Sequence, residues 1–113
     1  MDSGSEVYFA KEMDKLKVMW IKNDTIYFNY DPYNLRKRYY PDFYLPEYDL
    51  WVEIKGKRYI RPDDEIRRAS VPGGVYLIMA NNFRTEMPIF IEKISNMTKM
   101  VPRGNSAIPT YWV

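Results

Sequence analysis

The sequence contains neither cysteine nor histidine among its 113 residues. Without cysteine the chain can form no disulfide bond and no thiolate zinc site. Without histidine it has no serine–histidine or cysteine–histidine catalytic pair, no histidine metal ligand and no histidine base. Any chemistry must therefore depend on carboxylates, lysine, tyrosine, serine or threonine, alone or with a hard metal ion.

Long apolar runs are missing as well. No stretch approaches the roughly 20 apolar residues that a membrane-spanning helix needs, and the first residues lack the apolar core of a signal peptide. We therefore expect an intracellular protein without a membrane partner. The formal net charge of +2 is small, so it permits a nucleic-acid partner without demanding one.

The length of the chain fits a single domain with a modest core. We expect this domain over residues 1–97 and an irregular tail over 98–113, where two prolines and a glycine occur. The chain holds 11 tyrosines, and aromatic residues of this kind are typical of half-buried β-strands.

Apolar periodicity predicts an alternation of helices and strands. Phe9, Ala10, Met13 and Leu16 fall on one stripe of a helix. We expect helices over 3–20, 61–70 and 86–97 and strands over 25–30, 39–45, 50–56 and 75–80. The first three strands would form a meander, and the continuously apolar last strand is typical of a buried, parallel position. This order predicts a small α/β fold with a mixed β-sheet flanked by helices.

The segment Leu50–Gly56 carries two opposite charges inside an otherwise apolar strand. Because strand side chains alternate between faces, Val52 and Ile54 would pack on the core, whereas Glu53 and Lys55 would share the opposite face with Trp51. The triplet Glu53-Ile54-Lys55 by itself favours an ordinary surface ion pair between Glu53 and Lys55, which contributes little to stability.

Two further carboxylates point to a different interpretation. Asp42 lies on the preceding strand, so a short hairpin would bring it close to Glu53. Two converging carboxylates form a site for a hard divalent cation such as Mg²⁺. Glu6 lies in register with the apolar stripe of the first helix and so points toward the same region, although it could instead close a capping box on Ser3.

These residues match a known motif. Pro41-Asp42 and, after ten intervening residues, Glu53-Ile54-Lys55 resemble the signature of the PD-(D/E)XK nuclease superfamily. A glutamate on an upstream helix, here Glu6, is also similar to that family. The resemblance covers roughly residues 3–82 and is strongest to phage-type and transposon-type endonucleases, with junction resolvases in the same superfamily. It implies a restriction-endonuclease-like core and a place inside a cell, in the cytoplasm or within a phage-infected host.

The resemblance also implies a site and a reaction. Asp42 would be the central Mg²⁺ ligand and Glu53 the second, with the backbone carbonyl of Ile54 completing the set and Mn²⁺ able to substitute. Lys55 would orient or polarise the attacking water, and Glu6 would reach the metal directly or through water. The implied activity is metal-dependent endonucleolytic hydrolysis of DNA phosphodiester bonds.

Basic residues near these strands are candidates for phosphate contacts. They are Arg36, Lys37, Arg38, Lys57, Arg58 and Arg61. The alternative is a solvated run of charges, and Arg67 and Arg68 equally suit the exposed end of a short helix. Four tyrosines either stack on bases or are half-buried residues of the sheet, namely Tyr33, Tyr39, Tyr40 and Tyr48.

Two other functions remain open from the sequence. The chain could be a non-catalytic nucleic-acid-binding or assembly module that keeps the nuclease fold, although such a module has no need to place carboxylates beside phosphates. It could also be an RNA nuclease with the same core, since no residue pattern identifies a 2′-hydroxyl contact. A chain this small has little room for a separate recognition domain. We therefore expect it to form a homodimer, to take its specificity from a larger complex, or to act on DNA structures such as junctions, flaps or single strands.

Overall fold

The computed structural model describes residues 3–56 and 61–97. Lys57, Arg58 and the expected tail over 98–113 lie outside the described residues. The helices are α1 (Ser3–Lys15), α2 (Asp64–Ala69) and α3 (Phe83–Ser95), with a short 3₁₀ turn, η2 (Ala80–Asn82), before α3. The strands are β1 (Ile21–Lys22), β2 (Phe28–Asn29), β3 (Arg38–Tyr39), β4 (Phe43–Leu45), β5 (Leu50–Lys55) and β6 (Val75–Met79).

The main sheet has four strands in the order β1-β4-β5-β6. β4 pairs antiparallel with both β1 and β5, whereas β6 runs parallel to β5, with Trp51 paired with Val75 and Lys55 with Met79. Parallel neighbours need a crossover connection, and α2 supplies it between β5 and β6. A mixed sheet flanked by helices confirms the predicted α/β class.

The first strand of the meander differs from the prediction. Ile21–Lys22 pairs with β4, whereas the predicted strand over 25–30 contributes only Phe28–Asn29, which pairs with Arg38–Tyr39 in a separate two-stranded ribbon. The physical reason is a turn at Asn23, whose side chain accepts a hydrogen bond from the Ile26 amide and donates one to the Ile26 carbonyl. Asparagine favours turns of this kind because its side chain competes with the backbone.

The predicted strand over 39–45 is also divided. Tyr39 ends β3, and β4 begins only at Phe43, with Pro41 between them. Proline has no amide hydrogen to donate to a ladder, so a strand cannot continue through this position. The break separates the main sheet from the β2–β3 ribbon.

The first helix ends earlier than predicted, at Lys15 instead of residue 20. Lys17 adopts a positive φ of 57°, and hydrogen bonds from the Lys17 amide to Asp14 and from the Val18 amide to Met13 close the helix end. This is the Schellman pattern, with lysine in the position that glycine usually takes. Leu16 is therefore exposed, whereas Phe9 and Met13 of the predicted stripe are fully buried.

The last helix begins at Phe83, three residues before the predicted start at Glu86. The Glu86 carboxylate instead accepts a hydrogen bond of 2.6 Å from the amide of Met79 at the end of β6. A polar side chain within the helix therefore takes up an amide that the end of the strand would leave unpaired.

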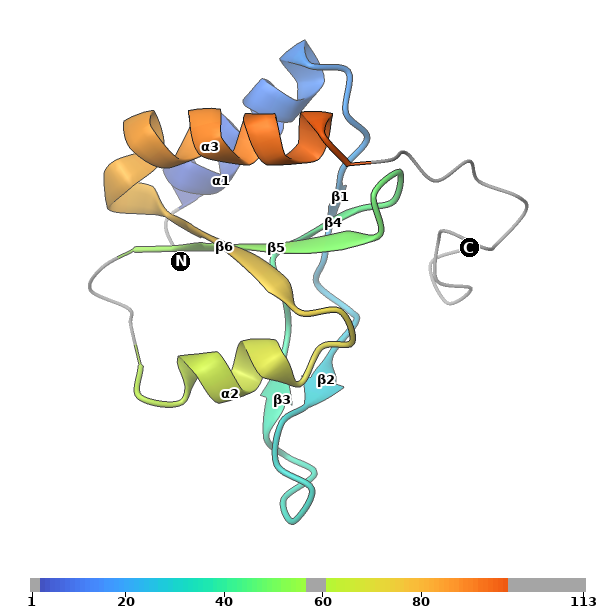
Figure 1. Ribbon diagram of the computed structural model, residues 1–113. Helices are drawn as coiled ribbons and strands as arrows, with labels where there is room; N and C mark the ends of the chain where they lie inside the picture. The colour runs from blue at the N-terminus through green and yellow to red at the C-terminus, as the bar shows by residue number, and fades with distance from the viewer. Residues whose placement is uncertain (1–2, 57–60, 98–113) are drawn as a thin grey trace.

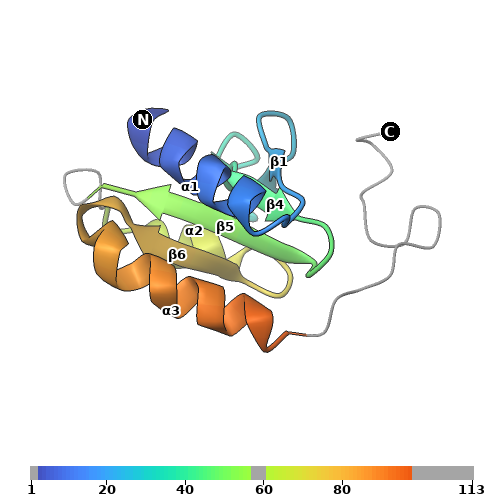
Figure 2. The same ribbon diagram turned by 90° about the horizontal axis from the view of Figure 1, so that it is seen from above.

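The two faces of the sheet have separate cores. α1 and α3 cover one face (Figures 1 and 2), where Val52, Ile54 and Ile78 from the sheet pack with Phe9 and Phe90. α2 and the β2–β3 ribbon lie on the other face (Figure 1), over a smaller cluster. Its buried members are Ile26, Tyr39, Tyr44, Trp51 and Val71. The predicted alternation along β5 is confirmed, but the face with Trp51 is covered as well.

None of the helices in residues 3–56 and 61–97 combines the length and apolar character that crossing a membrane requires.

The packing of α3 predicts a large difference between two isoleucines on the same helix. Ile94 is buried in the main core, whereas Ile89 is 55% exposed. We expect Ile94→Ala to lower the free energy of unfolding by about 2–5 kcal/mol, because it leaves a cavity, and Ile89→Ala to change it by less than about 0.5 kcal/mol. Urea unfolding followed by circular dichroism measures both, and equal effects would contradict the placement of α3.

Candidate functional site

The register of the β-hairpin brings Asp42 and Glu53 together. Phe43 pairs with Val52 and Tyr44 with Trp51, so one further step along the same register sets Asp42 opposite Glu53. Opposite residues of an antiparallel pair point to the same face, and here that is the face with Tyr44 and Trp51. The expected convergence of these two carboxylates is therefore a consequence of strand pairing.

Two backbone contacts fix the position of Asp42. The Asn23 amide donates to the Asp42 carbonyl at 2.9 Å, and the Asn23 side-chain amide donates to the Pro41 carbonyl at 2.8 Å. Asn23 is itself buried, so its polar groups need these partners. Its role was not predicted from the sequence, where Asn23-Asp24 signals only the end of an element.

The Asp42 side chain lies at the end of the hairpin ladder. Its Oδ2 atom accepts a hydrogen bond of 2.8 Å from the Ile54 amide, and within the described residues it has no salt-bridge partner. Asp42 as a whole is only 5% exposed. Burial raises the pKa of Asp42 to about 6, the Ile54 amide and Lys22 oppose this increase, and Glu6 and Glu53 add to it.

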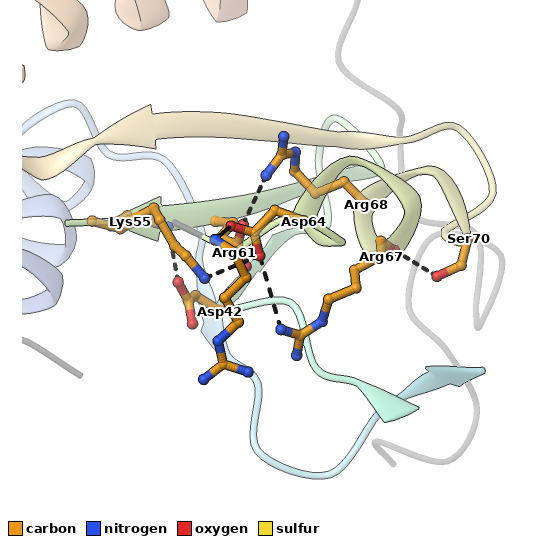
Figure 3. A network of polar contacts seen from close by, with 9 residues as sticks. Asp42, Lys55, Arg61, Asp64, Arg67, Arg68 and Ser70 are labelled. Carbon is orange, nitrogen blue, oxygen red and sulfur yellow. Dashed lines mark hydrogen bonds and ion pairs between the residues drawn. The ribbon is translucent and has the colours of Figure 1, made fainter. Parts of the chain in front are cut away.

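Glu53 is also buried, but it has a cationic partner. Arg68 of α2 contacts its Oε2 atom at 3.4 Å (Figure 3). Tyr39, a member of the smaller apolar cluster, lines the same cavity as Glu53. Burial raises the pKa of the Tyr39 hydroxyl, and the Glu53 carboxylate raises it further, although this hydroxyl makes no geometrically acceptable hydrogen bond within the described part of the chain.

Lys55 is held by an aspartate that the sequence did not indicate. Its Nζ atom lies 3.3 Å from Oδ1 of Asp64 (Figure 3), and both side chains are largely buried. The Arg61 amide donates to Oδ2 of Asp64 at 2.7 Å. Burial acts to raise the pKa of Asp64, but the Arg61 amide and Lys55 outweigh it, so this pKa is lowered.

The signal for Asp64 was weak in the sequence. An acidic residue in the first turn of a helix is common, because the helix dipole favours it there. Only the crossover geometry shows that α2 begins beside the end of β5, where the Asp64 carboxylate meets Lys55. Sequence spacing alone does not contain this information.

Glu6 forms a salt bridge with Lys22 of β1. The Glu6 carboxylate adds to the raised pKa of Asp42, but Glu6 lines a separate pocket with Lys22 and Phe43. Within residues 3–56 and 61–97, no three acidic side chains are grouped closely enough to hold a metal ion together. A contact from Glu6 to a metal, direct or through water, stays a prediction.

A cavity of about 230 Å³ joins these groups. It is lined by Tyr39, Asp42, Glu53, Lys55, Arg61 and Arg67, among others. Asp42, directly before β4, and Glu53 and Lys55 of β5 supply the carboxylates and the lysine. Arg61, before α2, and Arg67 of α2 supply the arginines (Figure 3). The cavity is thus formed where the parallel strand pair and the hairpin meet.

The predicted phosphate contacts fall in separate places. Arg36, Lys37 and Arg38 are exposed on the β2–β3 hairpin, and Arg61 is exposed at the cavity. Lys57 and Arg58 are outside the described residues. The interpretation of Arg67 and Arg68 as surface residues is wrong, because both side chains are mostly buried and lie against Asp64 and Glu53.

Comparison of this chain with protein-family models, with curated proteins and with solved structures finds no match.

The raised pKa of Asp42 predicts a pH-dependent loss of stability. Because the folded pKa of about 6 lies above the unfolded value of 3.8, folding favours the protonated form. The stability from this preference is fully present below about pH 4 and is lost as the pH rises through 6, up to about 3 kcal/mol. Asp42→Asn keeps an acceptor for the Ile54 amide without the charge.

We therefore expect Asp42→Asn to be more stable than the wild type at pH 7.5, with the difference disappearing toward pH 4. Urea unfolding of both proteins across this pH range, in EDTA, measures it. A difference that does not change with pH would contradict the assignment of the raised pKa to Asp42.

The buried pair of Lys55 and Asp64 predicts strong energetic coupling. Removing one partner leaves an uncompensated buried charge, so Asp64→Asn should cost about 3–5 kcal/mol. The double variant Lys55→Met/Asp64→Asn should cost less than the sum of the single variants by at least about 1 kcal/mol. The exposed pair Glu12–Lys15 is the control, with an expected coupling of about 0.5 kcal/mol or less. Equal coupling in the two pairs would show that Lys55 does not depend on Asp64.

Proposed function

We propose that this chain is a Mg²⁺-dependent endonuclease that hydrolyses DNA phosphodiester bonds, with a site of the PD-(D/E)XK type. The observation that supports this most directly is the placement of Asp42, Glu53 and Lys55 on one face of the sheet around a single cavity. These are the residues on which the resemblance of the sequence rests. Strand register and the start of α2 bring them together independently of that resemblance.

The order of the elements supports the same proposal. Apart from the β2–β3 ribbon, which is inserted between β1 and β4, the chain forms a helix, three antiparallel strands, a crossover helix and a strand parallel to the third. This order is similar to the core of the superfamily that the sequence resembles. Pro41-Asp42 lies directly before the second of these strands, β4, and Glu53-Ile54-Lys55 lies along the third, β5.

The donor set fits a hard divalent cation. Asp42 and Glu53 offer carboxylate oxygens in a buried position, and the raised pKa of Asp42 reflects negative charge that its surroundings only partly compensate. A cation between the two would remove that cost, and Mg²⁺ prefers oxygen ligands while keeping several waters. When bound, it would supply an activated water and charge stabilisation for phosphodiester hydrolysis.

The proline of the motif gives a reason for the third ligand. The hairpin register that sets Asp42 opposite Glu53 sets Pro41 opposite Ile54. Proline cannot donate to the Ile54 carbonyl, and the Ile54 amide is used by the Asp42 carboxylate. The Ile54 carbonyl therefore has no amide hydrogen opposite it at Pro41, on the β4 side of the strand. This suits its proposed role as a ligand.

Lys55 would act on the phosphate and the attacking water from the edge of the cavity. Its ammonium group is a hydrogen-bond donor and a positive charge, and Asp64 fixes its position at 3.3 Å. Asp64 is thus a positioning residue in this proposal. Arg61, exposed at the same cavity, would contribute a second positive charge toward a bound phosphate.

The proposal predicts metal-dependent cleavage. With Mg²⁺ or Mn²⁺ the purified protein should cut at least one DNA in a panel of duplex, single-stranded, flap and four-way-junction substrates, and EDTA should stop it. Asp42→Asn and Glu53→Gln should lower the rate by at least about 100-fold, since each removes charge at the reacting centre. Exposed Asp24→Asn and Glu65→Gln are matched controls and should keep wild-type rates.

Metal binding is tested separately from cleavage. Mg²⁺ should raise the melting temperature of the wild type and of Asp24→Asn but not that of Asp42→Asn. Robust cleavage in EDTA, or no cleavage of any DNA in the panel, would contradict the proposal. Cleavage of RNA alone would support the RNA nuclease instead.

A further inference from the structure

The β2–β3 hairpin displays apolar side chains that nothing in the described residues covers. It projects away from the main sheet, beyond α2 (Figure 1). Near its tip Tyr33 is 96% exposed and Leu35 is 74% exposed. Single exposed apolar residues are ordinary on a protein surface, but an aromatic and an aliphatic side chain standing together at the end of a projecting hairpin indicate a contact surface.

The tip is held in shape by its own hydrogen bonds. The Asp31 carboxylate accepts from the Tyr33 amide at 2.9 Å, and the Asn34 side chain accepts from the Arg36 amide at 3.1 Å. Asn29 donates to the carbonyls of Asn34 and Lys37 across the hairpin. A loop with this many internal bonds loses little conformational entropy on binding, so Tyr33 and Leu35 are presented in a defined arrangement.

Positive charge surrounds the exposed side chains. Three consecutive positively charged residues are exposed there, Arg36, Lys37 and Arg38, and the nearby Asp31 carries a negative charge. The Arg38 guanidinium lies over the ring of Tyr27 at 4.4 Å. The hairpin thus combines an apolar tip with a basic shaft, and this charge is complementary to phosphates.

We propose that the tip of the β2–β3 hairpin stacks on an unpaired base of DNA while Arg36, Lys37 and Arg38 contact the adjacent phosphates. This inference rests on the proposed function and narrows its substrate to DNA with unpaired bases, such as single strands, flaps or branch points. Aromatic side chains stack on any exposed base. In a perfect duplex the base faces are already stacked, and insertion between them costs a few kcal/mol per step.

The hairpin is connected directly to the proposed site. β3 runs into Pro41 and Asp42, so Tyr33 lies nine residues from Asp42 and at most about 32 Å away along an extended chain. At 3.4 Å per base step along a strand, this is a reach of roughly nine nucleotides. A DNA strand with one base held at the tip would therefore bring a phosphate to Asp42 and Glu53 within roughly nine nucleotides of that base.

Binding measurements in EDTA test the proposal without depending on cleavage. Fluorescence anisotropy would give the dissociation constants for a perfect duplex and for the same duplex with a single-stranded flap. We expect the wild type to prefer the flap, and Tyr33→Ala to weaken flap binding by roughly 5- to 150-fold with little effect on the duplex. Tyr33→Phe keeps the ring and should keep the preference.

Two further variants separate stacking from charge and from nonspecific effects. Lys37→Ala should weaken binding to both DNAs about equally and lower the salt dependence. Ile89→Ala truncates an exposed aliphatic residue on α3, far along the chain from the hairpin, and as a control it should leave both affinities unchanged.

Equal losses on duplex and flap for Tyr33→Ala would overturn the inference, as would unchanged flap binding. Failure of the wild type to bind any DNA would also overturn it, and would leave a protein partner as the occupant of the tip. A wild type that cuts DNA but shows no role for Tyr33 would refute this inference alone. A wild type that binds flaps through Tyr33 but cuts nothing would refute the proposed function alone.

Discussion

The hydrogen bond from the Ile54 amide to the Asp42 carboxylate is the interaction on which the site depends. The hairpin ladder ends where Pro41 meets Ile54, because proline has no hydrogen to donate. The Ile54 amide then requires another acceptor, and the Asp42 carboxylate supplies it at 2.8 Å. The end of the ladder thereby holds a buried carboxylate at the register position opposite Glu53.

The charges around this point are arranged unequally. Glu53 is paired with Arg68, Lys55 with Asp64, and Glu6 with Lys22. Asp42 accepts a hydrogen bond from a backbone amide and has no salt bridge within the described residues, and burial raises its pKa. Structural ion-pair networks normally compensate buried charge, so a single uncompensated carboxylate inside such a network is the pattern expected of a functional site.

The sequence predicted the features that depend on the alternation of side chains along one strand or on residues that are close together along the chain. The alternation of Val52, Glu53 and Ile54 follows from strand geometry, and the convergence of Asp42 with Glu53 follows from a short hairpin. Asp64, Asn23 and the strand at Ile21–Lys22 were missed because their roles depend on contacts between segments distant in space or on a two-residue pairing without a sequence signal. The nuclease assignment itself stays a proposal.

The two faces of the sheet bury different kinds of side chain. Val52, Ile54 and Ile78 bury their side chains under α1 and α3, where apolar packing supplies most of the folding free energy. On the opposite face, Asp42, Glu53 and Lys55 are held under α2, a helix of only six residues, at a cost in desolvation. Because side chains alternate along β5, each charged residue of the motif is adjacent in sequence to a residue of the apolar core. The strand that fixes the position of Glu53 and Lys55 is therefore itself fixed by the better packed face, which is what allows a small domain to keep buried, incompletely paired charges in place.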